Sequence, residues 1–476
     1  MEIFRSIEKR RIAILVAVIM SVSSFGVIAT DYSYAAKKKK VTSVTLTNVG
    51  NAFSIKKGES KKLKYRITAK KKYRKVKWKS SNKNIVSVNK RGIITAKKKG
   101  TAYITVYSKT KKRIKDRVKI TVTVPVTSVL LGGSTIYVKQ GEQKRIVSSV
   151  KPSDASNKSL GWTSSDNTIA SVSSNGVVLG KQKGMVTIRA TANDGSGKYG
   201  YVTVKVINLS RSDAEFIAHR GYSSNAPENT LVAFEMASRN NFHGAEMDVW
   251  ESDAYLKETD DPDYMEDCFD LNIMHDSSTG RMCDKDVDIW AVNDLNRHDY
   301  PITKGNGIDN YSTQYIPTLE DALSILNETN IETGHETLPV IELKQDSYSN
   351  EAIVHMIDLV QDYGGSATFI SFKTNPLNQI QEEIDVRVKK GILADGQIQT
   401  NYLANSIDQS VVDSCVSNGY SGISISYKAI TESIISYAHS QGLIVAAWTI
   451  PSMEEAARLI DMGVDRVTSD YKIFTE

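Results

Sequence analysis

The stretch Phe216-Ile217-Ala218-His219-Arg220-Gly221 is a short apolar run that ends abruptly in an imidazole and a guanidinium. Such a run predicts a buried strand that delivers both polar side chains to its carboxyl end. Gly221 permits an immediate turn, and the last two residues of Pro227-Glu228-Asn229-Thr230 can cap a helix that follows. One His-Arg pair is weak evidence for catalysis, but the pattern of a strand with a polar end recurs downstream.

The region from Arg211 onwards alternates short apolar runs with amphipathic helical stretches. About eight strand-helix units in about 265 residues predict a closed parallel α/β barrel of the TIM type. An open doubly wound sheet is the main alternative, although no Gly-rich phosphate loop follows the first strand. The expected strands are 215–218, 244–249, 271–274, 338–343, 367–371, 391–393, 422–424 and 443–448.

Polar residues follow several of these strands, and in such barrels the chemistry sits at the carboxyl ends of the strands. Glu246 and Asp248 lie two residues apart on one strand and therefore face the same side. With Glu342 they form a set of hard oxygen ligands, which suits Ca²⁺ or Mg²⁺ better than zinc. The other polar or aromatic strand ends are His219, Arg220, His275, Asp276, Lys344 and Trp448.

Each of these residues also has a purely structural interpretation. Glu246 and Asp248 can pair with Arg220 and Lys344 in an ion-pair network. The His275-Asp276 pair can be a helix cap, and Trp448 can belong to the core. Because carboxylates end two separate strands, one structural explanation for all of them is less favoured than a shared site.

The order of these motifs resembles the glycerophosphodiester phosphodiesterase family through essentially the whole of 211–476. The resemblance implies hydrolysis of glycerophosphodiesters to glycerol 3-phosphate and an alcohol with a bound divalent cation, Ca²⁺ being preferred over Mg²⁺. It implies His219 and His275 as general acid and base, Glu246, Asp248 and Glu342 as metal ligands, and Arg220, Lys344 and Trp448 as substrate-binding residues. The matching segments are His219-Arg220-Gly221, Pro227-Glu228-Asn229-Thr230, Glu246-x-Asp248, His275-Asp276, Ile316-Pro317-Thr318-Leu319-Glu320, Ile341-Glu342-Leu343-Lys344, Trp448-Thr449 and Gly463-Val464-Asp465.

Two segments depart from the family pattern and bear on substrate fit. Pro451 stands where the family usually has Asn after the tryptophan motif, and Ser469-Asp470-Tyr471 replaces the usual Thr-Asp-x-Pro. An acidic insertion between Trp250 and Leu271, centred on residues 257–268, follows the second strand. We expect a solvated loop there. The functional alternative is a lid or a second cation site that screens substrates.

The amino terminus has the form of a secretory signal peptide, residues 1–35. Basic residues precede an apolar run from Ile12 to about Ile28, and small residues offer cleavage after Ala35. An uncleaved membrane anchor is the alternative. No later stretch is apolar enough to span a bilayer, so we expect a secreted protein, associated with the cell surface or cell wall. Three cysteines provide neither a disulfide framework nor metal spacing.

Residues 41–208 contain two copies of one pattern with a period of roughly 84 residues. Short β-branched strands separated by Gly, Asn and Ser predict two all-β sandwiches, 36–125 and 126–208, each with a tryptophan filling its core. Both copies resemble group 2 bacterial immunoglobulin-like repeats, which typically act as spacer or adhesion modules. The matching segments are Trp78-Lys79-Ser80-Ser81 with Gly92 and Gly100, and Trp162-Thr163-Ser164-Ser165 with Gly176 and Gly184.

The first sandwich, called the basic domain below, is strongly cationic. Between Lys37 and Pro125 the sequence contains about 30 basic residues and only two acidic ones, Glu59 and Asp116. This excess favours attachment to an anionic envelope polymer such as teichoic acid over a merely solvated surface. Interleaved aromatics are sparse, which argues against specific nucleic-acid recognition.

Together these patterns predict a secreted, metal-dependent phosphodiesterase of residues 211–476, held at the envelope by its immunoglobulin-like domains. Two alternatives remain. One is a surface adhesin whose barrel does not catalyse. The other is an enzyme acting on lysophospholipids, which would need an apolar rim, whereas the insertion here is acidic.

Overall fold

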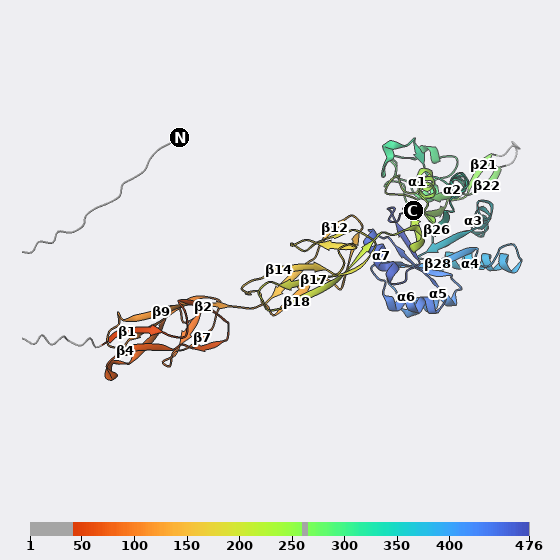
Figure 1. Cartoon of the computed structure of the whole chain (residues 1–476). Helices are drawn as coiled ribbons and strands as arrows, with labels where there is room; N and C mark the ends of the chain where they lie inside the picture. Colours follow the sequence, from red (N-terminus) through yellow and green to blue (C-terminus); the bar gives the residue numbers. More distant parts are fainter. Residues whose placement is uncertain (1–40, 259–264, 476) are drawn as a thin grey trace, which may run out of the picture. The chain divides into compact units, whose positions relative to one another are not determined.

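The computed structural model describes residues 41–258 and 265–475 (Figure 1). The expected signal peptide lies outside these residues. The described residues divide into two compact units, one up to Thr123 and one from Val124 onwards. Within the described residues, no helix combines the length and apolar character that a membrane crossing requires.

The basic domain is a sandwich of short strands, as the β-branched runs predict. A four-stranded sheet in the order β2-β9-β8-β5 faces a three-stranded sheet β3-β7-β6, with β1 and β4 paired beside them. Ile94, Ile104 and Ile120 are fully buried between the sheets. The strands are β1 (Val41–Leu46), β2 (Ala52–Lys56), β3 (Ser60–Lys62), β4 (Tyr65–Ala69), β5 (Val76–Ser80), β6 (Val86–Val88), β7 (Ile93–Ala96), β8 (Gly100–Ser108) and β9 (Lys115–Thr123).

The second immunoglobulin-like domain repeats this plan strand for strand. Its sheets have the orders β11-β18-β17-β14, β12-β16-β15 and β10-β13, which correspond one to one with those of the basic domain. The strands are β10 (Ser128–Leu131), β11 (Thr135–Lys139), β12 (Gln143–Arg145), β13 (Ser148–Lys151), β14 (Leu160–Ser164), β15 (Ala170–Val172), β16 (Val177–Gly180), β17 (Gly184–Ala192) and β18 (Tyr199–Ile207).

The two tryptophans do not fill the sandwich cores, contrary to the prediction. Trp78 and Trp162 are only partly buried and pack at the edge of each core. Each ring lies over a glycine with φ of +75°, Gly92 or Gly176. A Cβ on either glycine would come within 2.6 Å of the ring, so the recurring Trp and Gly form one packing unit.

The carboxy-terminal domain is a closed barrel of eight parallel strands. The strand order is β19-β31-β30-β29-β28-β27-β26-β20, and pairing of β19 with β20 closes the ring. The strands are β19 (Glu215–Ala218), β20 (Gly244–Glu251), β26 (Leu338–Leu343), β27 (Ala367–Ser371), β28 (Ile398–Ala404), β29 (Gly422–Ser426), β30 (Ile444–Trp448) and β31 (Arg466–Ser469). The predicted fold class is confirmed.

Two expected strands need correction, and two strands of the ring were not expected. Residues 271–274 form β23 (Leu271–Ile273), which pairs antiparallel with β20 and is not part of the ring. Residues 391–393 are a turn, and the ring uses β28 instead. Strands β28 and β31 escaped detection because their inward positions carry polar side chains, such as Asn401 and Arg466, and so neither strand has an apolar run.

Helices surround the barrel, as Figure 1 shows. Thr230, rather than Asn229, caps the first of them, because its side chain accepts the backbone N–H of Ala233. The helices are α1 (Leu231–Arg239), α2 (Leu319–Thr333), α3 (Asn350–Asp362), α4 (Thr374–Lys389), α5 (Gln409–Ser417), α6 (Glu432–Ser440) and α7 (Met453–Asp461).

The acidic insertion forms a two-stranded hairpin of β21 (Tyr255–Glu258) and β22 (Met265–Cys268). Residues 259–264 lie outside the described residues, so its role as loop or lid stays a prediction. A longer connection between β23 and β26 holds the small ribbon of β24 (Pro301–Ile302) and β25 (Gln314–Tyr315) over its own apolar cluster. This connection supplies His275, Asp276 and Arg281 to the site described next.

Candidate active site

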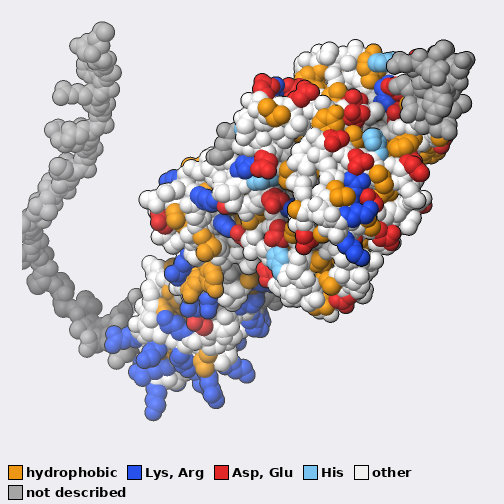
Figure 2. Space-filling model, turned by 90° about the vertical axis from the view of Figure 1, so that its right-hand side faces the viewer, with side chains coloured by type: hydrophobic (Ala, Val, Ile, Leu, Met, Phe, Trp, Pro, Cys, Tyr) orange, Lys and Arg blue, Asp and Glu red, His pale blue; other side chains and the backbone are white. Residues whose placement is uncertain are grey.

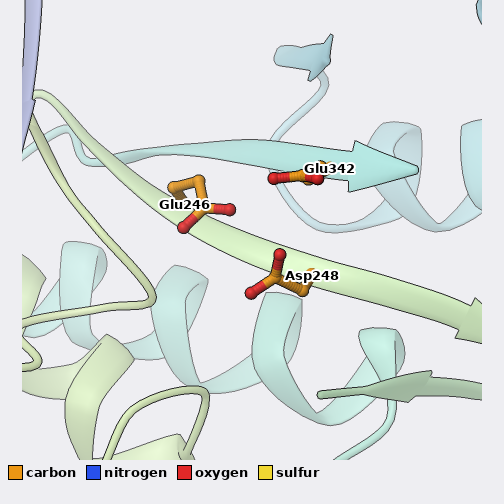
Figure 3. A group of neighbouring side chains, drawn as sticks. All are labelled: Glu246, Asp248 and Glu342. Carbon is orange, nitrogen blue, oxygen red and sulfur yellow. The ribbon is translucent and has the colours of Figure 1, made fainter. Parts of the chain in front are cut away.

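Three carboxylates converge at the carboxyl ends of two neighbouring strands. Glu246 and Asp248 extend from β20 and Glu342 from β26, and one oxygen of each lies within 4.8 Å of the other two (Figure 3). The register brings them together because Asp248 is paired with Glu342 in the parallel ladder. Glu246 and Asp248 are 2% and 0% exposed. The convergence that the two-residue spacing predicts is therefore present.

The carboxylates repel one another in a poorly solvated place. Burial raises the pKa of Glu246 well above its usual range, and the charges of Asp248 and Glu342 raise it further. Burial and Asp248 also raise the pKa of Glu342 to about 7. Burial acts in the same direction on Asp248, but Lys344 and Arg220 outweigh it and lower the pKa of this carboxyl.

Two cations offset part of this charge. Lys344 Nζ donates to Glu342 Oε1 at 2.8 Å and lies 3.1 Å from Asp248 Oδ1. Arg220 Nε lies 3.6 Å from Asp248 Oδ2. The ion-pair network considered as a structural alternative is therefore present, but it does not account for Glu246.

Glu246 lacks a cationic partner among the described residues. Its Oε2 accepts the backbone N–H of Arg220 at 2.7 Å, while its buried Oε1 has no hydrogen-bond partner within the described part of the chain. Unpaired buried carboxylate oxygens are costly unless a ligand satisfies them. The three converging carboxylates, with Oε1 of Glu246 left without a partner in the described part of the chain, therefore fit a hard divalent cation.

Each predicted catalytic histidine has its own carboxylate partner. His219 Nδ1 lies 2.6 Å from Asp470 Oδ1, and His275 Nδ1 lies 2.6 Å from Asp276 Oδ1. Because an ionised carboxylate only accepts hydrogen bonds, each Nδ1 carries the proton and each Nε2 is left to act. Burial lowers the pKa of His275, although Asp248 opposes that effect.

A chain of ion pairs joins the two sides of the site. Arg220 Nη1 donates to Glu228 Oε1 at 2.9 Å, and Arg281 Nη2 donates to the same oxygen at 2.6 Å. Arg281 Nε also donates to Asp276, the partner of His275. The sequence offered no strand-end signal for Arg281, because it lies in the long connection after β23.

Backbone strain helps to place these groups. Arg220 and Asn229 both have φ of +56°, a left-handed conformation that is uncommon for residues other than glycine. Asn229 is buried and donates from Nδ2 to Asp248 Oδ2 at 2.8 Å. Asn229 thus orients a carboxylate rather than capping α1. Strain at such positions is typical of functional sites.

The site opens into a pocket inside the barrel mouth. His219, Arg220, Glu246, His275, Glu342, Lys344 and Trp448 all line it. Trp448 donates from Nε1 to the backbone oxygen of Ser424 at 3.0 Å, and Phe372 packs edge-on against its ring at 5.5 Å. Phe372 therefore extends the aromatic wall that the sequence predicted from Trp448 alone.

All eight predicted site residues thus lie at one end of the barrel. Asp470, noted in the sequence only as part of a departure from the family ending, proves to be the partner of His219. Pro451 is exposed beyond β30 and does not line the pocket. The contacts supplied by Glu228, Asn229, Arg281 and Phe372 could not be assigned from spacing, because each depends on loop geometry.

Comparisons with known protein families agree with this architecture. Residues 40–122 and 125–204 match the model of the bacterial Ig-like domain, group 2. Residues 219–252 and 271–472 match the glycerophosphoryl diester phosphodiesterase family. The gap in the second match coincides with the acidic insertion.

Individual relatives share only a modest fraction of identical residues with this chain. A glycerophosphodiester phosphodiesterase of Caldanaerobacter subterraneus subsp. tengcongensis is 24% identical over 266 residues, covering 53% of this chain and 93% of that protein. An uncharacterised protein of Clostridium acetobutylicum is 28% identical over 158 residues, and the chain spans only 16% of its length. A phosphodiesterase of Oleispira antarctica, solved with the product sn-glycerol-3-phosphate, shares 24% identity over 54% of this chain and 94% of that chain, with a TM-score of 0.44.

The chain therefore carries two group 2 bacterial immunoglobulin-like domains followed by a domain of the glycerophosphoryl diester phosphodiesterase family. These family matches confirm the predicted family and the predicted class of enzyme.

Proposed function

We propose that the barrel hydrolyses glycerophosphodiesters to glycerol 3-phosphate and an alcohol, and that it requires a divalent cation. The observation that carries this proposal is the convergence of three carboxylates, two of which line the pocket, with two pocket-lining histidines that each have a carboxylate partner. The family match supports the substrate class.

The cation would be held by Glu246, Asp248 and Glu342. Bound there, it would supply positive charge next to the phosphoryl oxygens and so lower the barrier to attack. Ca²⁺ is our preferred ion, because an all-oxygen site with carboxylates from two strands suits its flexible coordination.

The protein side chains divide the remaining work. Arg220 and Lys344 place fixed positive charge beside the phosphate, where it stabilises the charge that builds up during attack. One imidazole, unprotonated at Nε2, takes the proton of the attacking oxygen as that oxygen bonds to phosphorus. The other, entering the step as the imidazolium, gives its Nε2 proton to the leaving oxygen as that bond to phosphorus breaks. Asp470 and Asp276 hold the two rings with Nε2 free for this exchange. Trp448 and Phe372 offer an apolar wall for the carbon skeleton of the substrate.

We further propose that the enzyme is secreted and is retained at the envelope through its basic domain, which binds an anionic polymer such as teichoic acid. The form of residues 1–35 and the charge of the basic domain support this placement. Retention there would keep the barrel close to glycerol-phosphate polymers and deacylated phospholipids.

The test is product analysis with the full chain and a small panel of substrates in the presence of Ca²⁺. Glycerophosphocholine, glycerophosphoethanolamine and lysophosphatidylcholine are compared, with His219→Ala as the blank and a chelator as the metal control. Glycerol 3-phosphate from the deacylated diesters supports the proposal. Turnover of lysophosphatidylcholine alone supports the lysophospholipid alternative. If no substrate is turned over, the non-catalytic adhesin is supported.

A further inference from the structure

The basic domain carries a groove at the edge of its sandwich. Two aromatic side chains line it, Tyr65 from β4 and Trp78 from β5, with ring centroids 5.9 Å apart and ring planes 79° apart. Lys75, Lys77, Lys90 and Lys109 line the same groove, and all four are exposed. The groove thus combines an apolar floor with four positive charges.

The basic domain offers few acidic residues that could neutralise the lysines of this groove. The domain contains only two acidic residues, and both are bonded to backbone N–H groups. Asp116 accepts from Leu46 at 2.8 Å, and Glu59 accepts from Lys56 at 3.1 Å. Figure 2 shows Lys and Arg side chains crowded over the domain that follows the grey amino-terminal trace. Such exposed, unbalanced charge favours binding of an external anion.

The second immunoglobulin-like domain provides an internal control, because matching backbone hydrogen bonds fix the equivalent positions. Lys109 N donates to Lys75 O in the first copy, as Asn193 N donates to Ser159 O in the second. The strand pairing of Lys77 with Tyr107 corresponds to that of Gly161 with Thr191.

The packing of Trp on Gly is identical in both copies, but the groove residues are not. By the same correspondence, Tyr65 and Lys90 match Ser148 and Ser174. Every charged or aromatic residue that distinguishes the groove, apart from the structural tryptophan, is therefore replaced by a small or polar residue in the second domain. The fold does not require these lysines.

We infer that the groove of Tyr65, Trp78 and the four lysines is a binding site for a polyol-phosphate polymer, with the lysines contacting successive phosphates and the rings contacting the carbon backbone between them. The choice of a glycerol-phosphate chain rests on the proposed function, since such a chain is built from the diester class assigned to the barrel. A nucleic acid is disfavoured, because Tyr65 stands edge-on to a partly buried Trp78 and the pair offers no stacking platform for successive bases.

The test measures binding of a fluorescent poly(glycerol phosphate) to the full chain at fixed ionic strength. One variant replaces the groove lysines by serine (Lys75→Ser, Lys77→Ser, Lys90→Ser and Lys109→Ser), the residue that the second domain has at the positions equivalent to Lys75 and Lys90. A charge-matched variant replaces four exposed lysines that do not line the groove (Lys56→Ser, Lys83→Ser, Lys98→Ser and Lys119→Ser). A third carries Tyr65→Ser alone; Tyr65 is 39% exposed, so its loss spares the core.

We expect the groove variant to lose affinity at least about tenfold more than the charge-matched variant, because direct phosphate contacts outweigh diffuse charge. Tyr65→Ser should weaken binding of the glycerol-phosphate polymer by about threefold to tenfold, with little effect on inorganic polyphosphate, which has no carbon backbone. Equal losses in the two lysine variants, or tighter binding of single-stranded DNA of the same charge, would overturn the inference.

Turnover of glycerophosphocholine separates this inference from the proposed function. The groove variant should hydrolyse that small diester at the unsubstituted rate while it loses the polymer. If the unsubstituted chain hydrolyses no diester, the proposed function fails, whereas a difference between the two lysine variants would still establish the groove as a polymer site. Unfolding of the groove variant is checked by its circular dichroism, and Tyr65→Ser keeps the inference testable if that variant does not fold.

Discussion

The barrel mouth and the groove of the basic domain both present positive charge to a phosphate, but they hold it in opposite ways. In the mouth, Arg220 and Lys344 are partly buried and fixed against carboxylates. In the groove, four exposed lysines belong to a domain whose sequence contains only two acidic residues. Buried, paired charge gives geometry suited to chemistry, whereas exposed, unpaired charge gives affinity that salt can screen. The predictions below test this contrast, from the largest expected effect to the smallest.

The largest effect is expected from Glu246→Gln in the mouth. Loss of one metal ligand should lower kcat/KM for glycerophosphocholine by about a thousandfold or more. The thermal midpoint should stay the same or rise in the presence of a chelator, because the amide removes a buried charge that Asp248 and Glu342 repel. Turnover and calorimetry on the same preparations measure both quantities. A variant that is both inactive and strongly destabilised would indicate a structural role for Glu246 instead.

Salt should separate the two regions next. Between about 50 and 200 mM salt, binding of poly(glycerol phosphate) should weaken by about a hundredfold if four phosphates are contacted. Turnover of glycerophosphocholine should change by less than about twofold, because the charges of the mouth are poorly accessible to screening ions. Titrations of binding and rate in one buffer series measure the contrast, which is broken if both quantities fall in parallel.

A smaller effect is expected at Arg281, which acts on the mouth only through Glu228 and Asp276. Arg281→Lys keeps the charge but loses the fork that joins both carboxylates, so kcat should fall by about tenfold to a hundredfold with KM little changed. The alkaline limb of the rate profile should also shift as the support of His275 weakens. A change in KM alone would show that Arg281 contacts substrate rather than positioning the histidine.

The smallest expected effect is that of acid, which should lower the stability of the barrel without changing polymer binding by the basic domain. All seven histidines lie in the barrel domain. Burial lowers the pKa of His243 from its usual 6.5 to about 4, and its Nδ1 accepts the N–H of Phe216 at 3.0 Å. Because the neutral ring is the folded form, its stabilising contribution is complete above pH 6.5 and is lost as the pH falls through about 4.

The barrel transition in calorimetry should therefore move to lower temperature between pH 7 and pH 5, and His243→Gln should reduce that shift. Binding of the polymer by the basic domain should stay constant over the same range, since that domain contains no histidine. A pH-dependent loss of polymer binding in step with the barrel transition would contradict this separation.

Much of the architecture could be predicted from the sequence, because the decisive signals are local. Apolar strands such as 338–343 and the alternation of Glu246 and Asp248 follow from single-strand periodicity. Strands β28 and β31 could not be found in that way, because Asn401 and Arg466 face the pocket and interrupt the apolar pattern. The strand expected at 271–274 exists, but nothing in its sequence distinguishes an antiparallel edge strand from a member of the ring.

The site itself was predictable in its strand-end residues and not in its supporting contacts. His219 and His275 end apolar segments, which made them visible. Asp470 lies about 250 residues from His219 in the chain and meets it only because β31 and β19 are neighbours in the closed ring. The groove of the basic domain was equally hidden, because its lysines are a few among about 30 and only the fold selects them.

The most direct test of the convergence at the barrel mouth is release of glycerol 3-phosphate from glycerophosphocholine by the full chain with Ca²⁺, measured beside His219→Ala and His275→Ala. The unsubstituted chain should release one glycerol 3-phosphate for each choline, and each variant should lose at least about a hundredfold in rate. Release at an undiminished rate by both variants, or no release by the unsubstituted chain from any glycerophosphodiester, would contradict the assignment of this pocket as a phosphodiesterase site.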